Sequence, residues 1–148
     1  IILNTSYANR LVEYAIRGRK LSYLGRRKIF TREKKIEDYK CDLYIEDTKT
    51  VIEIKSIIST SEIGIFPTVY SERTLNQLCR IKELLGLGYN VDYIIVSLNP
   101  YVKKIEFLKN TQFYREFNEC INLGMSVHAF GCKIMKGFFL LDKELDIN

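Results

Sequence analysis

The sequence predicts an α/β fold with a mixed central sheet flanked by helices. The antiparallel part is a hairpin between Tyr39 and Ser56, whose two arms alternate apolar and polar residues as half-buried strands do. The parallel part follows from a helix at 71–85 and a continuous apolar strand at 91–98, because a strand–helix–strand succession favours a crossover between parallel strands. A length of 148 residues suits a single domain with a buried core.

The part of the chain before the hairpin predicts one helix and one strand. Polar residues 4–6 (Asn, Thr, Ser) offer N-caps for a helix of about ten residues that ends at Gly18. A basic edge strand at 28–35 then leads into the hairpin. Residues at helical spacing predict the buried side of the helix: Tyr7, Leu11, Tyr14 and Ala15.

The part after the hairpin predicts a loop at 57–69, anchored by Phe66, and then the helix at 71–85. A third helix begins after Asn110 or Thr111 and ends at Gly124. A strand at 125–130 and one or two short closing strands at 132–141 complete the chain. The apolar spacing predicts these buried residues in the two helices: Leu75, Leu78, Cys79, Ile81, Leu85, Phe113, Phe117, Cys120 and Ile121.

Charge favours a polyanionic partner, most simply DNA or RNA. The net charge is +5 with a pI near 9.0, and ten Lys or Arg residues lie between Arg17 and Lys40 against three acids. The alternative is a solvated basic surface. No apolar run approaches the ~20 residues that span a bilayer, and the first residues show no signal-peptide pattern, so we expect no membrane partner.

The remaining motifs narrow the function further. The four cysteines form no Cys-x-x-Cys pair, so we expect reduced, buried thiols in a cytoplasmic protein and neither a zinc nor an iron–sulfur site. Gly86-Leu87-Gly88 follows a helix rather than a strand, which excludes a dinucleotide fingerprint and leaves no small-molecule cofactor. His128, the only histidine, is expected to be structural because no nucleophile set can be built around it.

The hairpin carries the candidate metal site. If Asp47 and Thr48 form its turn, Asp42 lies opposite Glu53, and a four-residue loop keeps this register. Facing carboxylates lie about 5 Å apart at their Cβ atoms and repel each other. A divalent cation such as Mg²⁺ would remove that repulsion, and Lys55 on the same face could stabilise developing negative charge. The alternative is an ordinary solvated sheet face that carries charges.

The helix at 71–85 offers a second group of polar side chains. Arg73, Gln77 and Arg80 follow i, i+4, i+7 spacing and therefore share one face. Two arginines that flank a glutamine could bind phosphates. The alternative is a solvated helix face.

The chain resembles the sugar fermentation stimulation protein family, which carries the core of the PD-(D/E)xK nuclease fold, restriction-endonuclease-like in its order of elements. The resemblance covers nearly all 148 residues. It rests on the following stretches: Asn9-Arg10-Leu11-Val12-Glu13, Arg32-Glu33, Asp42 to Lys55, Phe66-Pro67 with Ser71-Glu72-Arg73, and Phe113 to Phe130.

The resemblance implies nucleic acid as substrate or partner, with Mg²⁺ or Mn²⁺ as the metal. Asp42 and Glu53 match the metal ligands, Lys55 the catalytic lysine and Glu33 a further acid near the site. Four residues are then expected to bind nucleic acid: Arg32, Arg73, Gln77 and Arg80. The chain departs from the family pattern at Thr68, where the family has Asp, and at Gln77, where it has His.

The family also carries an N-terminal OB-like domain that these residues lack. Either the chain is a fragment, or its single nuclease-like domain, residues 1–148, binds nucleic acid without that module. We expect a metal-dependent nuclease that hydrolyses phosphodiester bonds, with DNA and RNA both open as substrates. The alternative from a different class is a nucleic-acid-binding transcriptional regulator with a vestigial nuclease site. A structural module with no nucleic-acid role is disfavoured by the basic cluster.

Overall fold

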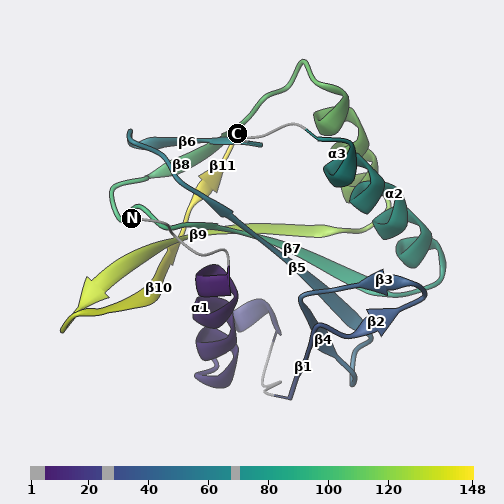
Figure 1. Ribbon diagram of the computed structural model, residues 1–148, viewed down its shortest axis with the longest axis horizontal. Coiled ribbons are helices and arrows are strands. Elements are labelled where there is room, and N and C mark those ends of the chain that lie inside the picture. The colour runs from purple at the N-terminus through teal and green to yellow at the C-terminus, as the bar shows by residue number, and fades with distance from the viewer. Residues whose placement is uncertain (1–5, 25–28, 68–70) are drawn as a thin grey trace.

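The computed structural model describes residues 6–24, 29–67 and 71–148 (Figure 1). Its centre is a curled, mixed six-stranded sheet in the order β1-β4-β5-β7-β9-β10. β5, β7 and β9 run parallel to one another, and β1, β4 and β10 are antiparallel to their neighbours. The strands of this sheet are β1 Thr31–Arg32, β4 Leu43–Ile45, β5 Thr50–Ile57, β7 Asn90–Ser97, β9 Ser126–Met135 and β10 Phe138–Glu144.

Helices cover both faces of the sheet. α2 (Glu72–Gly86) and α3 (Gln112–Asn122) lie side by side on one face, and α1 (Ser6–Arg17) lies on the other (Figure 1). Ser71 caps the start of α2 and Thr111 that of α3, since each side chain accepts a hydrogen bond from the backbone N–H three residues further along. A 3₁₀ helix, η1 (Ser22–Leu24), follows α1. None of the helices in the described part of the chain is long and apolar enough to cross a membrane.

Two smaller sheets complete the fold. The first has the order β11-β8-β6 and is parallel throughout. The second is a hairpin of β2 and β3 beside the main sheet (Figure 1). Their strands are β6 Ile63–Phe66, β8 Lys104–Phe107, β11 Asp146–Ile147, β2 Lys35–Ile36 and β3 Tyr39–Lys40.

Two hydrophobic cores lie on the two faces of the sheet. The core under α2 and α3 contains an aromatic cluster around Phe66 and Phe117, while α1 packs on the second core through residues such as Val12 and Ile16. Alternate residues of β7 belong to different cores, because successive strand side chains point to opposite faces. This alternation decides which polar side chains share a pocket.

The predicted hairpin register is confirmed. Leu43 pairs with Ile52 and Ile45 with Thr50 across a four-residue loop, in which Lys49 adopts a positive φ of 52°. The first arm is shorter than expected, however. Tyr39 and Lys40 pair with β2 instead of β5, so the chain breaks strand geometry just before Leu43.

The prediction of a loop at 57–69 was wrong over residues 63–66, which form β6. Gly64 lies in this strand, and a Cβ at this position would lie 2.9 Å from Cδ1 of Ile105 and closer still to Ile57. Glycine is needed there because the strands approach closely. Phe66 is buried as predicted.

Other predictions were wrong in detail. The basic strand expected at 28–35 is two short strands, β1 and β2, and its first residue lies outside the described residues, as do the caps expected at 4 and 5. The closing segment is one long hairpin, β9–β10. Three side chains expected to be buried are instead exposed: Tyr14, Cys79 and Ile121. All four cysteines are free thiols, and the three besides Cys79 are buried.

Candidate metal and nucleic-acid site

A pocket of about 580 Å³ lies where β5, the hairpin arm before β4 and the N-terminal turn of α2 meet. It collects acidic, basic and hydroxyl side chains from segments far apart in the sequence. Its lining residues are Asn9, Glu33, Lys40, Cys41, Asp42, Glu53, Ile54, Lys55, Ser56, Ser71, Arg73, Thr74 and Gln77.

Glu53 is the buried acid of this pocket. It lies in the middle of β5 and is only 4% exposed. The hydroxyl of Tyr39 donates a hydrogen bond to Oε2, and Nζ of Lys55 lies 3.1 Å from Oε1. Burial and then the charge of Asp42 raise the pKa of Glu53, Lys55 and Tyr39 oppose this rise, and the resulting pKa is about 7. Glu53 is therefore a carboxylate that an additional cation would stabilise.

Asp42 is held beside Glu53 by the backbone of the neighbouring strand. Its Oδ2 accepts a hydrogen bond of 2.7 Å from the backbone N–H of Ile54, and its Oδ1 accepts one of 3.3 Å from Nδ2 of Asn9 in α1. Burial raises the pKa of Asp42, although these two hydrogen bonds favour the charged form. Asp42 also repels Glu53 electrostatically, which is the expected behaviour of two facing carboxylates.

Lys55 shares the sheet face of Glu53, because residues two apart in a strand point the same way. Its Nζ donates a hydrogen bond of 2.8 Å to Oε1 of Gln77 in α2 as well as pairing with Glu53. Gln77 thus fixes the lysine head group from the helix side. Arg73, one turn earlier in α2, lines the same pocket.

The structure brings most of the predicted site residues together, and these line the pocket: Asp42, Glu53, Lys55, Glu33, Arg73 and Gln77. Arg32 lies in an adjoining pocket of about 430 Å³, where its Nε is 2.6 Å from the buried carboxylate of Glu13. Of the predicted site residues, Arg80 lies away from both pockets, since it pairs with Glu83 and lines neither of them.

Sequence reasoning missed two residues that hold the acids in place. Tyr39 reaches Glu53 from β3, and no periodicity signals this contact because β3 does not pair with β5. Asn9 reaches Asp42 from α1. Asn9 does belong to one of the stretches that carry the family resemblance, but its spacing alone gives no sign of its partner.

The carboxylates present fit a magnesium-type ion. Within residues 6–24, 29–67 and 71–148, no group of three His, Cys, Asp or Glu side chains is arranged to hold a metal. The candidate protein ligands are therefore only two carboxylates, those of Asp42 and Glu53. Mg²⁺ is commonly held by one or two carboxylates and completes its octahedron with water and phosphate oxygens.

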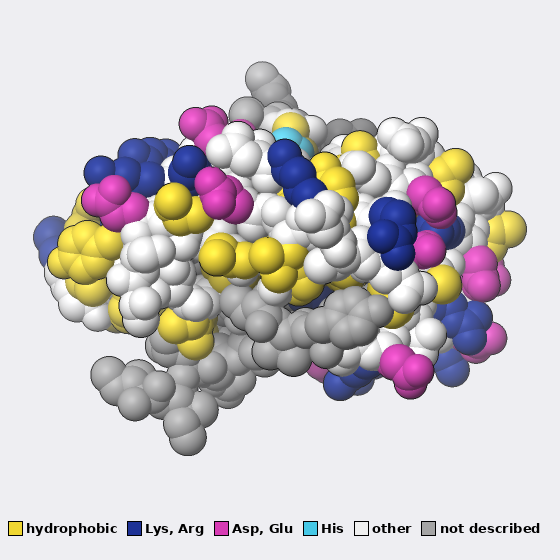
Figure 2. Space-filling model, turned by 90° about the horizontal axis from the view of Figure 1, so that it is seen from above, with side chains coloured by type: hydrophobic (Ala, Val, Ile, Leu, Met, Phe, Trp, Pro, Cys, Tyr) yellow, Lys and Arg dark blue, Asp and Glu magenta, His cyan; other side chains and the backbone are white. Residues whose placement is uncertain are grey.

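The basic cluster between Arg17 and Lys40 is partly neutralised. Four of its described members form ion pairs with acids, and Arg17 lies over the ring of Phe30, 5.1 Å from its centroid. On the face seen in Figure 2, Lys and Arg side chains also lie next to Asp and Glu side chains. The pairs of the cluster are Arg32–Glu13, Lys34–Glu46, Lys35–Asp38 and Lys40–Glu33.

Comparison with known proteins identifies the family. Residues 6–137 match the model of the sugar fermentation stimulation protein RE domain. The chain belongs to the sugar fermentation stimulation protein family. Sugar fermentation stimulation protein homologues from two strains of Clostridium kluyveri are 23% identical to this chain over 155 residues. The alignment covers 99% of this chain and 66% of each relative.

A solved structure shares the fold. The SfsA protein of Pyrococcus furiosus, solved in complex with Ca²⁺, matches with a TM-score of 0.85 at 20% sequence identity. The match covers 99% of this chain and 66% of that protein. The family expected from the sequence motifs is confirmed, and so is the mixed sheet flanked by helices.

Proposed function

We propose that this chain is a metal-dependent nuclease domain of the PD-(D/E)xK type, with its active site in the pocket around Asp42, Glu53 and Lys55. The observation that carries the proposal is the meeting of two largely buried carboxylates and a lysine at the floor of one pocket. Both acids have raised pKa values, so neither is in the environment that suits its own charge best. Strained ionisable groups of this kind are typical of functional sites.

Asp42 and Glu53 would hold one Mg²⁺ or Mn²⁺ ion. The bound ion would supply positive charge to a phosphate and lower the pKa of a bound water. Tyr39 and Asn9 orient the two carboxylates, as partners of metal ligands commonly do. The Ca²⁺ complex of the Pyrococcus furiosus relative supports a divalent cation in this family.

Lys55 would act on the phosphate rather than on the metal. An ammonium cannot be a ligand, but it can stabilise negative charge that develops on the phosphate oxygens during hydrolysis. Gln77 accepts one hydrogen bond from Nζ of Lys55 and so aims the head group into the pocket. Glu33, at the rim, is exposed and lies 4.0 Å from Lys40, which places an acid within the site without burying it.

The N-terminus of α2 would bind the nucleic-acid backbone. The free N–H groups and dipole of a helix N-terminus favour phosphate, and Ser71, Arg73 and Thr74 add two hydroxyls and a guanidinium at the pocket rim. Arg32 in the adjoining pocket extends the positive charge. DNA and RNA share these phosphate contacts, so the proposal covers both.

Cleavage assays test the proposal directly. The chain should cleave single- or double-stranded DNA or RNA in Mg²⁺ or Mn²⁺ and not in excess chelator. Lys55→Ala should abolish cleavage and keep the thermal stabilisation by Mn²⁺. Lys103→Ala is the matched control, because Lys103 forms an exposed ion pair with Glu62 away from the pocket.

Two results would contradict it. Stabilisation by metal together with nucleic-acid binding, but without cleavage of any of the four substrates, would favour the regulator with a vestigial site. No response to either metal in the wild type would rule out the site itself.

A further inference from the structure

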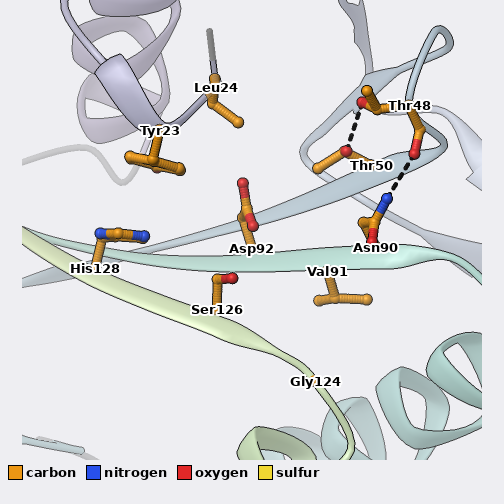
Figure 3. Close-up of a pocket in the computed structure, with 10 residues that line it drawn as sticks. All are labelled: Tyr23, Leu24, Thr48, Thr50, Asn90, Val91, Asp92, Gly124, Ser126 and His128. Atoms are coloured by element: carbon orange, nitrogen blue, oxygen red, sulfur yellow. Dashed lines mark hydrogen bonds between the residues drawn. The ribbon is translucent and has the colours of Figure 1, made fainter.

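A second polar pocket lies on the opposite face of the sheet. Asp92 of β7 pairs with Ile52 and Ser126, whereas Glu53 pairs with Tyr93. Neighbouring residues of a strand point to opposite faces, so the Asp92 side chain faces away from Glu53 and toward α1 and η1. The cavity has a volume of about 300 Å³ (Figure 3). Its lining residues are Tyr23, Leu24, Thr48, Thr50, Asn90, Val91, Asp92, Gly124, Ser126 and His128.

The Asp92 carboxylate is buried without a partner. Asp92 is 6% exposed, yet it makes no hydrogen bond or ion pair within the described chain. No side-chain polar atom described is both fully enclosed and unpaired, so the carboxylate oxygens must open onto the cavity. Figure 3 shows this side chain rising from β7 into the space below Tyr23 and Leu24. Burying a carboxylate without hydrogen bonds is costly, so an unpaired one requires an explanation.

The neighbouring polar groups do not satisfy Asp92 because they bind one another. Thr48 and Thr50 share a hydrogen bond of 2.7 Å, and the Asn90 amide donates to the carbonyl of Thr48 (Figure 3). His128 bonds through Nδ1 to Glu144. Its ring also stacks on Tyr23 with a centroid separation of 3.8 Å.

The pocket has the charge of a cation site. Asp92 is its acid, and none of the ten lining residues that the structure describes is Lys or Arg. Burial raises the pKa of Asp92, the charge of His128 opposes this rise, and the resulting pKa is about 6. The carboxylate is therefore mostly ionised at neutral pH.

We propose that this pocket binds a small organic cation, whose ammonium or guanidinium group donates hydrogen bonds to Asp92. A guanidinium offers five N–H donors in a planar fork that matches a carboxylate. Ser126, on the neighbouring strand, adds a hydroxyl beside the carboxylate, and Leu24 adds an apolar wall for the ligand's carbon atoms. The cavity is at the lower end of the size range of small-molecule sites, which limits the ligand to a small molecule. This site does not depend on the proposed nuclease site.

NMR titration of the chain with agmatine and methylguanidinium tests the proposal. Backbone amide signals of Asn90, Asp92, Ser126 and His128 should shift at up to about 10 mM ligand, which corresponds to a weak but specific fragment affinity. N-methylurea has nearly the same shape as methylguanidinium but no charge, and it should leave these signals unchanged. Equal shifts with N-methylurea, or none with the cations, would overturn the proposal.

Variants separate binding from structure. Asp92→Asn should weaken binding at least about tenfold, since it removes the charge-assisted pairing. The same variant should be at least as stable as the wild type without ligand, because it removes an unpaired buried charge; a clear loss of stability would instead assign Asp92 a structural role.

Two further variants complete the test. Ser126→Leu alters an exposed residue and should block the cavity, so retained binding in this variant would also contradict the proposal. Asp142→Asn is the matched control, because Asp142 is a surface acid whose Oδ1 lies 4.0 Å from Nζ of Lys133. This variant should bind the cations as the wild type does.

Discussion

Replacing Glu53 by Gln should stabilise the metal-free protein at alkaline pH and hardly change it in acid. The pKa of Glu53 rises from its ordinary 4.5 to about 7, chiefly through burial. Between these two pH values the folded chain keeps the proton and the unfolded chain loses it, so the free energy of unfolding falls as pH rises. The contribution is fully present below about pH 4.5 and is lost as the pH passes through about 7.

The magnitude follows from the same pKa values. A change of one in pKa corresponds to about 1.4 kcal/mol, so ionising Glu53 in the fold costs about 3 kcal/mol. Gln resembles the neutral acid in shape. Its amide oxygen can accept from Lys55, and its NH₂ group can donate to the Tyr39 oxygen. The Gln variant therefore lacks this pH dependence. Near pH 8 its free energy of unfolding should exceed that of the wild type by up to about 3 kcal/mol.

Urea denaturation in chelator, repeated from about pH 5 to pH 8.5, measures this difference. The gap between variant and wild type should widen with pH while the denaturant slope stays constant. Glu62→Gln is the matched control, since Glu62 is an exposed acid in an ion pair with Lys103 and should track the wild type. A gap that stays constant over this range would refute the assignment of Glu53 as a buried, strained carboxylate.

Metal should close most of this difference in unfolding free energy. A ligand at 100 times its dissociation constant stabilises the fold by about 2.7 kcal/mol through mass action. The wild type should gain this stabilisation with Mn²⁺, and the Gln variant, which lacks one of the two carboxylates, should gain little. Equal gains in both proteins would mean that the metal binds elsewhere.

Three further predictions concern nucleic-acid binding and the core. Arg73→Ala should weaken binding of a labelled oligonucleotide more than Arg80→Ala, because only Arg73 lines the pocket and Arg80 pairs with Glu83; fluorescence anisotropy measures both. Wild-type affinity in the same assay should fall steeply with salt through counterion release, and a flat response would contradict a phosphate-dominated interface. Phe117→Ala should lower the unfolding free energy by about 3–5 kcal/mol, because Phe117 is fully buried among Phe66, Phe107 and other rings, and a loss below about 1 kcal/mol would contradict that packing.

The hairpin register could be predicted because two independent signals agree. The alternation of both arms and an even-numbered loop leave one pairing that buries Leu43 against Ile52. The positions of Glu53 and Lys55 on one face follow from that register. The central position of β7 is likewise predictable, because its continuous apolar run needs cover on both faces.

The parts that sequence could not predict depend on contacts between distant segments. Tyr14 has the spacing of a core residue in α1, but it is 63% exposed because the helix rests on the sheet through Val12 and Ile16 instead. Tyr39 reaches Glu53 from a strand that belongs to another sheet. Periodicity identifies a side of an element and says nothing of which distant side chain meets it.

Glu53 and Asp92 lie on adjacent strands and opposite faces, and both have pKa values raised by burial. The stability of the fold does not explain either residue, because replacing buried charged groups by apolar side chains of similar size often leaves the stability unchanged or increases it. Their surroundings differ in a way that separates the two ligands. Glu53 has a second acid and a lysine beside it, an arrangement that suits a metal and a phosphate. Among the described residues that line its pocket, Asp92 has neither a second acid nor a lysine, and so it suits a single organic cation whose own N–H groups donate to the carboxylate.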